Sequence, residues 1–600
     1  MSSIVICLLS NHAVAQPRYN GSEVVVVDSS VRADPSVAIK LPTSQIKALS
    51  GSNILSSGAA MLYPSLDVRS YGSLGGVAFA TYRGLPAEFV TIEYNGVRLN
   101  TAQNSLSDLG LVDLNVTSSV MLSSSTSNTG LSGDIGNARL SLSGIQGLAS
   151  KTTVIASTEL TSYSEKVQAA ERVSSILASV PISDVVSVAG AFSNSGTNGD
   201  YPFYQSSTHE TILRSNNDAS LTNGSVSLTY KPSDSLRCDV FSLYTKSDRG
   251  APGANTVDYY GNSSFARQFD ELYLLGASLE QKVSERFFYI ARLAYESQFE
   301  TYNDSILSIA DRYTNRSLTA SVQTRTTLSA LLNLYADVSA DRNALASNED
   351  VAWGTTDISR MIVRSNIGLG YAPLEALSVD AHFKVEHYSD IHTLQVLPHF
   401  QIQYFFDFWQ ASLIASYTKL YHAPTFNELY WKIGGNPNLK PEAGNGYELT
   451  ADISPIERWN IKATGYLNEI DNQIVWVPGS VWSPDNVERV RSYGVELTSS
   501  FSYPIDEIYS IDLRGGLMLQ HTVNLTEGSI NYGNELIYST PLRWNVAVTG
   551  RANYIGQLTL GIIYRGHRYT DFANNGKLQP VGVTNVTFRS VPIKLTPDLS

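Results

Sequence analysis

Apolar and polar residues alternate along most of this chain from about residue 150 onward. The runs 225–230 and 236–244 place apolar side chains at every second position, which is the period of a β-strand with one apolar face. A short turn, Lys231–Ser235, joins these two runs. Such turns alternate with longer polar stretches, for example 194–218, 249–268 and 472–489. The pattern predicts antiparallel hairpins with short turns at one end and long loops at the other.

The hydrophobic runs are too short for membrane-spanning helices, which need about 18 or more consecutive apolar residues. Strands of about 9–11 alternating residues also cross a bilayer, provided that they close into a barrel. The chain contains 34 Tyr against 19 Phe and 7 Trp, and aromatic girdles of membrane barrels use such residues. A soluble β-protein rich in tyrosine has the same composition, so composition leaves both classes open.

The first 148 residues follow a different pattern. Leu41–Leu49 predicts a short helix that opens at a proline with a Ser/Thr cap. Val68–Gly76 is glycine-rich but lacks the Lys-Ser/Thr of a phosphate loop, so its glycines predict tight turns. The runs 79–83 and 88–93 are predicted to pair as strands. Asn95-Gly96 predicts a tight hairpin turn, because both residues tolerate positive φ.

The N-terminus has the features of an export signal. Ile4–Leu9 is a short apolar core, and Ala13-Val-Ala15 is typical of a cleavage site. No Lys or Arg precedes Ile4, so we expect a signal peptide over residues 1–15 that is truncated at its start.

Charge and cysteine content exclude several functions. The net charge of -13 makes nucleic acid an unexpected partner. Cys7 and Cys238 are the only cysteines, which excludes a thiolate cluster for zinc or iron–sulfur. Neither a Gly-x-Ser-x-Gly elbow nor a His-Glu-x-x-His motif occurs, so we do not expect an enzyme.

Several segments together resemble a known family. Arg83-Gly-Leu-Pro leads into an alternating strand and the Asn95-Gly96 turn. Tyr421–Tyr430 and Gly435–Glu442 contain the runs His-Ala-Pro-Thr-Phe and Asn-Pro-Asn-Leu-Lys-Pro-Glu. These passages resemble the TonB-dependent outer-membrane transporters over nearly the whole chain. The resemblance implies a mainly β fold, in which a large antiparallel transmembrane β-barrel of about 22 strands encloses an N-terminal α+β plug domain.

The run Asn95–Asn104, followed by Asp108–Asp113, is most similar to the vitamin B12 (cobalamin) receptor group. Two features depart from the family. At 120–137 the usual Glu-Val-x-Arg-Gly and paired glycines are missing, so the sequence does not predict in detail how the plug docks against the barrel. The chain stops at Asp598-Leu-Ser600 rather than at an aromatic residue. We therefore expect one or two final strands to be missing and the barrel to be incompletely closed.

The resemblance also implies the domain order and an energising partner. Residues 1–15 would be the signal peptide, 16–39 an N-terminal segment, 40–148 the plug and 149–600 the barrel. A TonB box is predicted at Glu23, Val24, Val25, Val26, Val27 and Asp28. This segment would pair as an added strand with TonB, which works with the inner-membrane ExbB/ExbD motor. The alternative is that it forms the first buried strand of the plug.

Site residues follow from the same resemblance. Arg83, Gly84, Asn95 and Gly96 are predicted to be structural in the plug, with Arg83 in the lumen paired with barrel carboxylates. Asn100, Gln103 and Asn104 are predicted to bind the ligand, although an ordinary polar loop is the alternative. No cofactor is expected. Loop carboxylates suit calcium, but their spacing is not that of a known site, so the metal stays unknown.

The implied function is active uptake of a scarce nutrient across the bacterial outer membrane. The ligand would be cobalamin or another corrinoid, and the alternative is a ferric siderophore or haem. A porin or an adhesin is a more remote alternative. The implied location is the outer membrane, in contact with its lipid.

Overall fold

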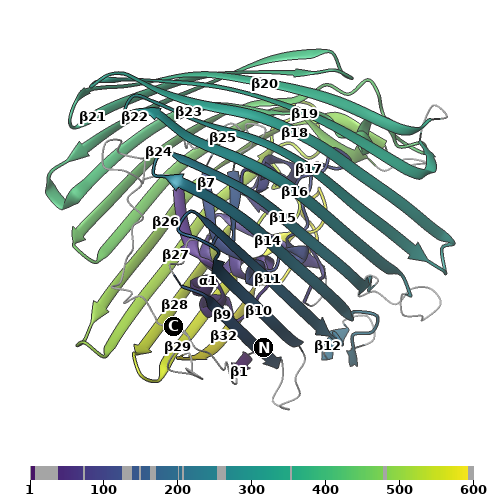
Figure 1. The fold of residues 1–600 in the computed structure, drawn as a ribbon. Coiled ribbons are helices and arrows are strands. Elements are labelled where there is room, and N and C mark those ends of the chain that lie inside the picture. Colours follow the sequence, from purple (N-terminus) through teal and green to yellow (C-terminus); the bar gives the residue numbers. More distant parts are fainter. Residues whose placement is uncertain are drawn as a thin grey trace.

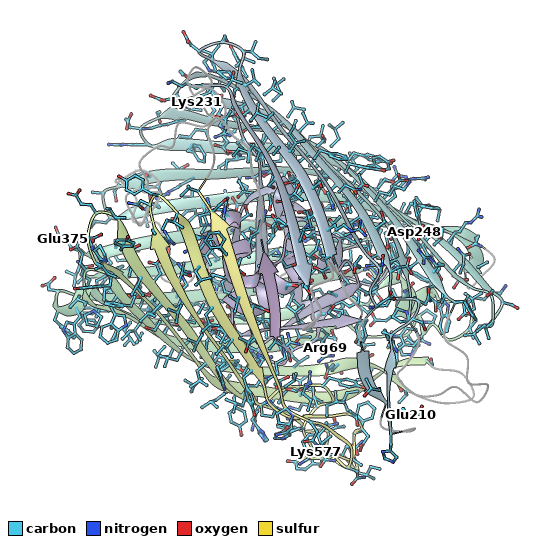
Figure 2. The ribbon with its side chains drawn as sticks, turned by 90° about the horizontal axis from the view of Figure 1, so that it is seen from below. Arg69, Glu210, Lys231, Asp248, Glu375 and Lys577 are labelled. Atoms are coloured by element: carbon cyan, nitrogen blue, oxygen red, sulfur yellow. The ribbon has the colours of Figure 1, made fainter. Side chains whose placement is uncertain are left out.

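The computed structural model of this chain shows a closed β-barrel with a smaller α+β domain inside it (Figure 1). Figure 2 looks into the barrel and shows the purple N-terminal elements enclosed by the ring of strands. The structure describes residues 2–6, 38–71, 74–124, 138–147, 151–162, 171–200, 202–205, 209–252, 265–351, 355–477 and 483–591.

Twenty-one of the described strands form the ring. In order around it they are β9 (Thr153–Ser162), β10 (Glu171–Pro181), β11 (Val186–Thr197), β14 (Ala219–Ser233), β15 (Leu236–Gly250), β16 (Arg267–Ser284), β17 (Phe287–Asp304), β18 (Ile309–Ser329), β19 (Leu332–Val351), β20 (Thr355–Leu374), β21 (Leu377–Tyr388), β22 (Thr393–Phe406), β23 (Ala411–His422), β24 (Glu442–Ile456), β25 (Trp459–Val477), β26 (Ser483–Pro504), β27 (Tyr509–Asn524), β28 (Leu542–Ala552), β29 (Gly556–Arg565), β32 (Val581–Ser590) and β1 (Ser2–Ile6).

The ring is closed, so the expectation of an incompletely closed barrel is wrong for this structure. Strand β1 closes it by pairing parallel with β32 and antiparallel with β9. Residues 2–6 belong to the predicted signal peptide, yet they lie in the wall as a strand. The physical reason is that β9 and β32 would otherwise present unpaired backbone groups at the seam, which is costly in lipid.

The predicted alternation corresponds to the two faces of the wall. On β14, Val226, Leu228 and Tyr230 are exposed on the outer face, whereas Ser227 and Thr229 between them are buried in the lumen. Such an apolar exterior and polar interior are the pattern of a membrane barrel. Two residues separate β14 from β15, and two separate β16 from β17, while a much longer stretch separates β15 from β16. Among the described residues no helix has the length and hydropathy needed to cross a bilayer.

The inner domain is the plug. Its elements are β2 (Ala38–Pro42), α1 (Thr43–Ser50), α2 (Leu55–Leu62), β3 (Leu66–Tyr71), β4 (Val77–Tyr82), β5 (Val90–Tyr94), β6 (Val97–Arg98), β7 (Thr117–Ser124) and β8 (Ala138–Gly144), with 3-10 turns at 87–89, 109–111 and 114–116. One sheet has the order β2-β7-β8-β5-β6, and β3 and β4 form a separate pair. Buried aliphatic and tyrosine side chains from both sheets and helices make its core.

The plug differs from the sequence prediction in its strand pairing. Strand β4 pairs with β3, and β5 pairs with β6 and, in parallel, with β8, so 79–83 and 88–93 are not partners. Arg83 and Gly84 adopt positive φ and a 3-10 turn follows, which directs the chain away before β5 begins. Helix α1 begins at Thr43 without a side-chain cap. The Thr43 hydroxyl instead donates to the Thr117 carbonyl at 2.9 Å.

Three small elements lie in the longer connections. Strands β12 (Pro202–Gln205) and β13 (Glu210–Leu213) form a hairpin between β11 and β14, and the short helix α3 (Phe426–Tyr430) follows β23. Strands β30 (Arg568–Tyr569) and β31 (Lys577–Leu578) pair with each other. This pair is part of a connection rather than of the wall.

The outer face of β16 offers a test of membrane insertion. Leu275 lies in the middle of this strand with 59% of its surface exposed, and Val283 lies on the same face at its end with 55% exposed. We expect Leu275→Arg to destabilise the barrel in lipid by about 2–4 kcal/mol, and the matched control Val283→Arg by at most about 1 kcal/mol. Urea unfolding in lipid vesicles measures both, and equal effects would contradict the placement of the bilayer.

Candidate functional site

The predicted TonB box, residues 23–28, lies outside the described residues. The first described element after it is β2, an edge strand of the plug sheet that pairs only with β7. Helix α1 follows β2 directly. A force applied N-terminal to β2 would therefore act first on an edge strand and one short helix.

Arg83 and Gly84 lie directly against the barrel wall. Both have positive φ, 51° and 75°. A Cβ atom on Gly84 would come within 2.1 Å of the Thr522 hydroxyl on β27, so no larger residue fits without displacing the wall. The Ser492 hydroxyl on β26 donates to the Arg83 carbonyl at 2.5 Å. The Arg-Gly pair thus allows the plug backbone to approach the wall closely.

The Arg83 guanidinium makes the pairs with barrel carboxylates that the sequence predicts. It contacts Glu448 of β24 at 3.1 Å and Glu496 of β26 at 3.4 Å, and its side chain is only 4% exposed. The rings of Tyr82 and Tyr466 lie 4.6 and 4.8 Å from the guanidinium carbon. A buried cation of this kind persists only when it is paired, so the two carboxylates fix this part of the plug.

A second ionic anchor has the charges reversed, with the anion in the plug and the cation in the wall. Asp67 of β3 is 2% exposed and contacts Arg543 of β28 at 3.0 Å. The Thr540 hydroxyl donates to the same carboxylate at 2.6 Å. Burial by itself would raise the pKa of Asp67, but Arg543, Arg565 and the hydroxyl outweigh it and hold the pKa below its ordinary value. Asp67 is therefore ionised in the docked plug.

A third anchor is Arg249 at the end of β15. Its guanidinium contacts Asp108 of the plug at 2.7 Å and Asp270 of β16 at 2.9 Å. It also donates to the Gly75 carbonyl at 2.7 Å. Asp108 in turn accepts from the backbone N–H groups of Ala78 and Gly110. One arginine therefore joins two plug loops to the wall.

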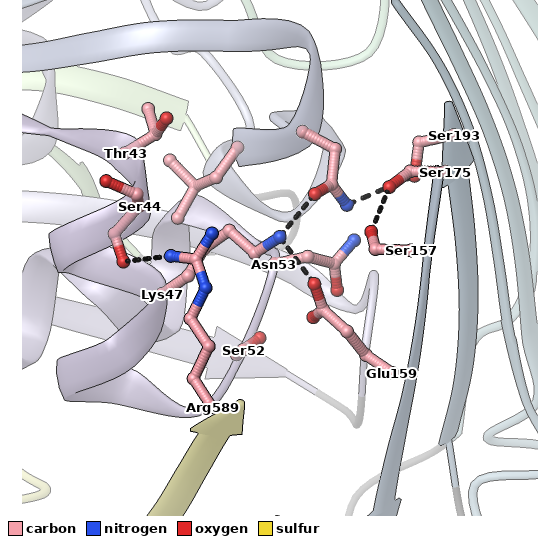
Figure 3. Close-up of polar contacts among 12 residues, drawn as sticks. Thr43, Ser44, Lys47, Ser52, Asn53, Ser157, Glu159, Ser175, Ser193 and Arg589 are labelled. Carbon is pink, nitrogen blue, oxygen red and sulfur yellow. Dashed lines mark hydrogen bonds and ion pairs between the residues drawn. The ribbon is translucent and has the colours of Figure 1, made fainter. Parts of the chain in front are cut away.

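Figure 3 shows a fourth contact, near the seam of the barrel. Lys47 of α1 is ion-paired with Glu159 of β9 and donates to Asn115. The Asn115 amide donates to the Ser193 hydroxyl at 3.3 Å, and Arg589 of β32 donates to the Ser44 carbonyl at 3.4 Å. Helix α1 is thus held from both sides of the seam.

Sequence reasoning missed Asp67, Arg543 and Lys47 as docking residues. A signal was present for Arg543, because this charge occupies an inward position in an alternating strand. A cation facing the lumen of a plugged barrel requires a partner. The sequence could not name that partner, since Asp67 lies more than 470 residues away.

Asn95 and Gly96 form the predicted hairpin turn. Their φ values are 51° and 77°, and Tyr94 and Val97 face each other across it. The Asn95 side chain accepts from the Gly144 N–H at 2.8 Å, which ties the turn to the end of β8. A Cβ atom on Gly96 would lie 3.1 Å from the Arg292 guanidinium of β17.

The three predicted ligand residues have different surroundings. Asn100 is buried, and its amide is engaged by the backbone of Val90, Ile92 and Ser105. Its position indicates a structural role in the loop rather than contact with a ligand. Gln103 is also buried and accepts from Asn315 of β18 at 2.7 Å.

Asn104 is the most accessible of the three. Its carbonyl oxygen accepts from the Thr101 hydroxyl and the Leu106 N–H, which closes the loop on itself. Its amide nitrogen makes no hydrogen bond among the described residues, so it remains available for a ligand. Asn104 therefore keeps its place as a predicted contact.

The family-like passage after β23 folds inward onto this loop. Thr425 and Glu428 form a capping box at the start of α3, with hydrogen bonds of 3.2 and 2.7 Å. The N–H groups of Phe426 and Asn427 lie in the first turn of α3 and have no acceptor within the helix. They donate to the plug carbonyls of Ala102 and Gln103. A short helix of the barrel thus completes its first turn with acceptors from the plug.

A cavity of about 210 Å³ lies between the loop 99–117 and strands β15 to β18. Gln103, Asn104 and Asp108 line it from the plug. Gln268, Asp270 and Asn315 line it from the wall. Within the described part of the chain, no three His, Cys, Asp or Glu side chains are arranged to hold a metal ion. The calcium expectation stays a prediction.

Comparison with known proteins identifies the class. The family model "TonB dependent receptor-like, beta-barrel" matches residues 183–596. The chain therefore belongs to the TonB-dependent receptor family, a family of outer-membrane receptors and not of enzymes, and its barrel is an outer-membrane β-barrel.

Individual proteins match the chain either over a limited part of its length or at low sequence identity. Over 178 residues the chain is 33% identical to the vitamin B12 transporter BtuB of Photobacterium profundum, which is 28% of this chain and 26% of that protein. The chain thus matches about a quarter of the length of this curated relative. A ferric enterobactin receptor of Pseudomonas aeruginosa superposes with a TM-score of 0.74 at 14% identity, over 94% of this chain and 91% of that chain. The siderophore receptor PirA of Acinetobacter baumannii gives 0.74 at 12% identity, over 93% and 92%. These likenesses establish the fold alone.

Removal of the Arg83 charge tests plug docking. In Arg83→Ala the largely buried side chains of Glu448 and Glu496 lose the guanidinium that they contact, and we expect the docked plug to be destabilised by about 3–5 kcal/mol. Hydrogen exchange of the β3–β4 amides in detergent should accelerate, while exchange in the barrel strands stays unchanged. As a control, adding Glu448→Gln and Glu496→Gln should restore part of the protection. Unaltered exchange in Arg83→Ala would rule out this anchor.

Proposed function

We propose that this protein imports a corrinoid across the outer membrane and draws its energy from TonB. The observation that carries the proposal is a separate plug domain that fills a closed barrel and is held there by buried ion pairs, hydrogen bonds and apolar contacts with the wall. Such a plug blocks passage at rest. It can be displaced by force without unfolding the wall, because the wall has its own closed set of strand pairs.

The energy must come from another compartment. The outer membrane has neither an ATP supply nor an ion gradient of its own. Residues 23–28 are a run of four valines between two acidic residues, and valine favours extended structure. Pairing of this segment with TonB would add main-chain hydrogen bonds through which a pull can be transmitted to β2 and α1.

Two observations support a corrinoid as the ligand. The partial relative is a vitamin B12 transporter, at 33% identity over 178 residues. Five amide side chains line the cavity: Gln103, Asn104, Gln268, Gln298 and Asn315. Amides both donate and accept hydrogen bonds, so they suit the peripheral amide groups of a corrinoid.

The second candidate is a ferric siderophore. It is favoured by the solved structures of similar fold, which include receptors for siderophores. Their identity of 12–14% to this chain relates the barrels but not the ligand contacts.

Direct titration distinguishes the two ligands. We expect purified protein in detergent to bind cyanocobalamin saturably in the nanomolar range, and ferric enterobactin much more weakly. Quenching of tryptophan fluorescence or calorimetry measures both, with ligand-free buffer as the blank. Tight binding of the ferric chelate without a saturable corrinoid signal would reverse the assignment.

Coupling is tested by proline in the predicted TonB box. Val25→Pro removes an N–H donor and disrupts strand addition, so uptake by whole cells should be abolished while surface binding is retained. Ala33→Pro, which lies beyond the box, serves as the matched control and should transport normally. Normal uptake in Val25→Pro would show that energy reaches the plug through another segment.

A further inference from the structure

Arginine side chains gather where the plug strand β3 meets the last strands of the wall. The site lies at the end of the barrel that carries the longer connections, which is the extracellular end of an outer-membrane barrel. Asp67 contacts Arg543 at 3.0 Å and Arg565 at 3.8 Å. Arg69 of β3 and Arg568 of β30 lie close enough to act electrostatically on Arg565. One carboxylate therefore lies within a group of four guanidinium ions.

Hydrogen bonds place Arg69 beside the connection that carries Arg568. The Arg69 guanidinium donates to the Tyr538 carbonyl at 3.3 Å and lies 5.6 Å from the centre of the Tyr538 ring. The Tyr538 N–H donates to the carbonyl of Tyr569, the residue after Arg568, at 2.8 Å. Tyr538 lies between β27 and β28, and Tyr569 lies between β29 and β32. The plug and two extracellular connections therefore meet at this point.

The carboxylates of these two connections are engaged elsewhere or face solvent. Glu535 pairs with a histidine of β27 at 3.0 Å. Asp571 accepts from two backbone N–H groups of its own turn, and Glu527 is exposed. Among the described residues, neither Arg69 nor Arg568 forms an ion pair. The cluster therefore keeps an excess of positive charge.

Arg69 and Arg568 also hold buried donors. The Nε atom of each is buried, and neither atom has a hydrogen-bond partner in the part of the chain that the structure describes. A buried cationic donor without a partner is costly. An arginine fork binds a phosphate or a carboxylate through two parallel hydrogen bonds. These donors therefore fit an anionic group that comes from outside the chain.

The position of Arg69 on the plug limits which anions reach it. Figure 2 shows the plug enclosed by the ring of strands, whereas the phosphates of the surrounding lipid lie outside that ring. A group that contacts both Arg69 and Arg568 therefore enters through the mouth of the bore. Cyanocobalamin carries one anionic group, the phosphodiester of its nucleotide loop, while its peripheral side chains end in uncharged amides.

We propose that Arg69 and Arg568 form an anion subsite at the mouth of the bore, which binds the phosphodiester of a nucleotide-bearing corrinoid. The inference rests on the proposed corrinoid uptake and names the ligand group that enters this site. Arg565 stays beside Asp67 and adds to the positive potential. Arg543 remains part of the plug anchor, so it is left unaltered in the test.

The test compares two corrinoids that differ in this anion. Cobinamide has the corrin ring of cobalamin but lacks the nucleotide loop with its phosphodiester. We would titrate the full protein in detergent at low salt with cyanocobalamin and with dicyanocobinamide. In Arg69→Gln and in Arg568→Gln we expect the affinity for cyanocobalamin to fall about tenfold, because a charge-assisted hydrogen bond is lost. The affinity for dicyanocobinamide should change by less than about twofold.

Two further variants assign the effect. Arg568→Lys keeps the charge but loses the fork, so it should recover part of the lost affinity. Arg458→Gln, in the exposed turn between β24 and β25, is the matched control and should leave both affinities unchanged. Equal losses for the two corrinoids, or unaltered binding of cyanocobalamin in both glutamine variants, would overturn the subsite alone. If neither corrinoid binds to the unaltered protein, the proposed function fails with it.

Discussion

The neutralisation of buried charge between plug and wall is the interaction on which this structure depends. The plug cation Arg83 contacts the wall carboxylate Glu448, and the plug anion Asp67 contacts the wall cation Arg543. Neither group could be buried alone, because removing a charge from water costs several kcal/mol unless a partner compensates. The two domains therefore require each other: the plug completes the ion pairs of the lumen, and the lumen completes those of the plug.

The ionic contacts of this interface are specific without being strongly adhesive, and buried apolar contacts accompany them. A buried ion pair contributes little net stability, since the attraction mainly offsets the cost of desolvation. It is nevertheless expensive to misalign, because a displaced charge loses its partner while it stays buried. This combination suits a domain that must hold one position at rest and still be separable from the wall.

Much of the fold follows from local sequence. Alternation over 225–244 predicts a hairpin with one apolar face, and the structure has β14 and β15 there with that face outward. The Asn95-Gly96 turn follows from backbone sterics alone. The partners of β4 and β5 did not follow, because β5 pairs with β8 across a long intervening segment. The closure by β1 also depends on a contact between opposite ends of the chain.

In the candidate site too, the residue types follow from the sequence, whereas their roles depend on contacts between distant segments. Asn100, Gln103 and Asn104 look equivalent in sequence, yet only the position of each amide decides its role. Asn100 is satisfied by its own loop, Gln103 is bound to the wall, and the amide nitrogen of Asn104 donates to no other described residue. Arg249 stands at the start of a polar stretch in the sequence, but its function as a clamp appears only when Asp108 and Gly75 are placed beside it.

The positions of the charged anchors around the bore have a geometric consequence. A smooth plug in a nearly cylindrical tube would be free to rotate about the long axis. The ion pairs of the plug with β24, β28 and β15 lie at different positions around the barrel axis. All three form together at only one rotational orientation of the plug. A surface shared by plug loop and wall is thereby assembled in the same register in every copy of the molecule.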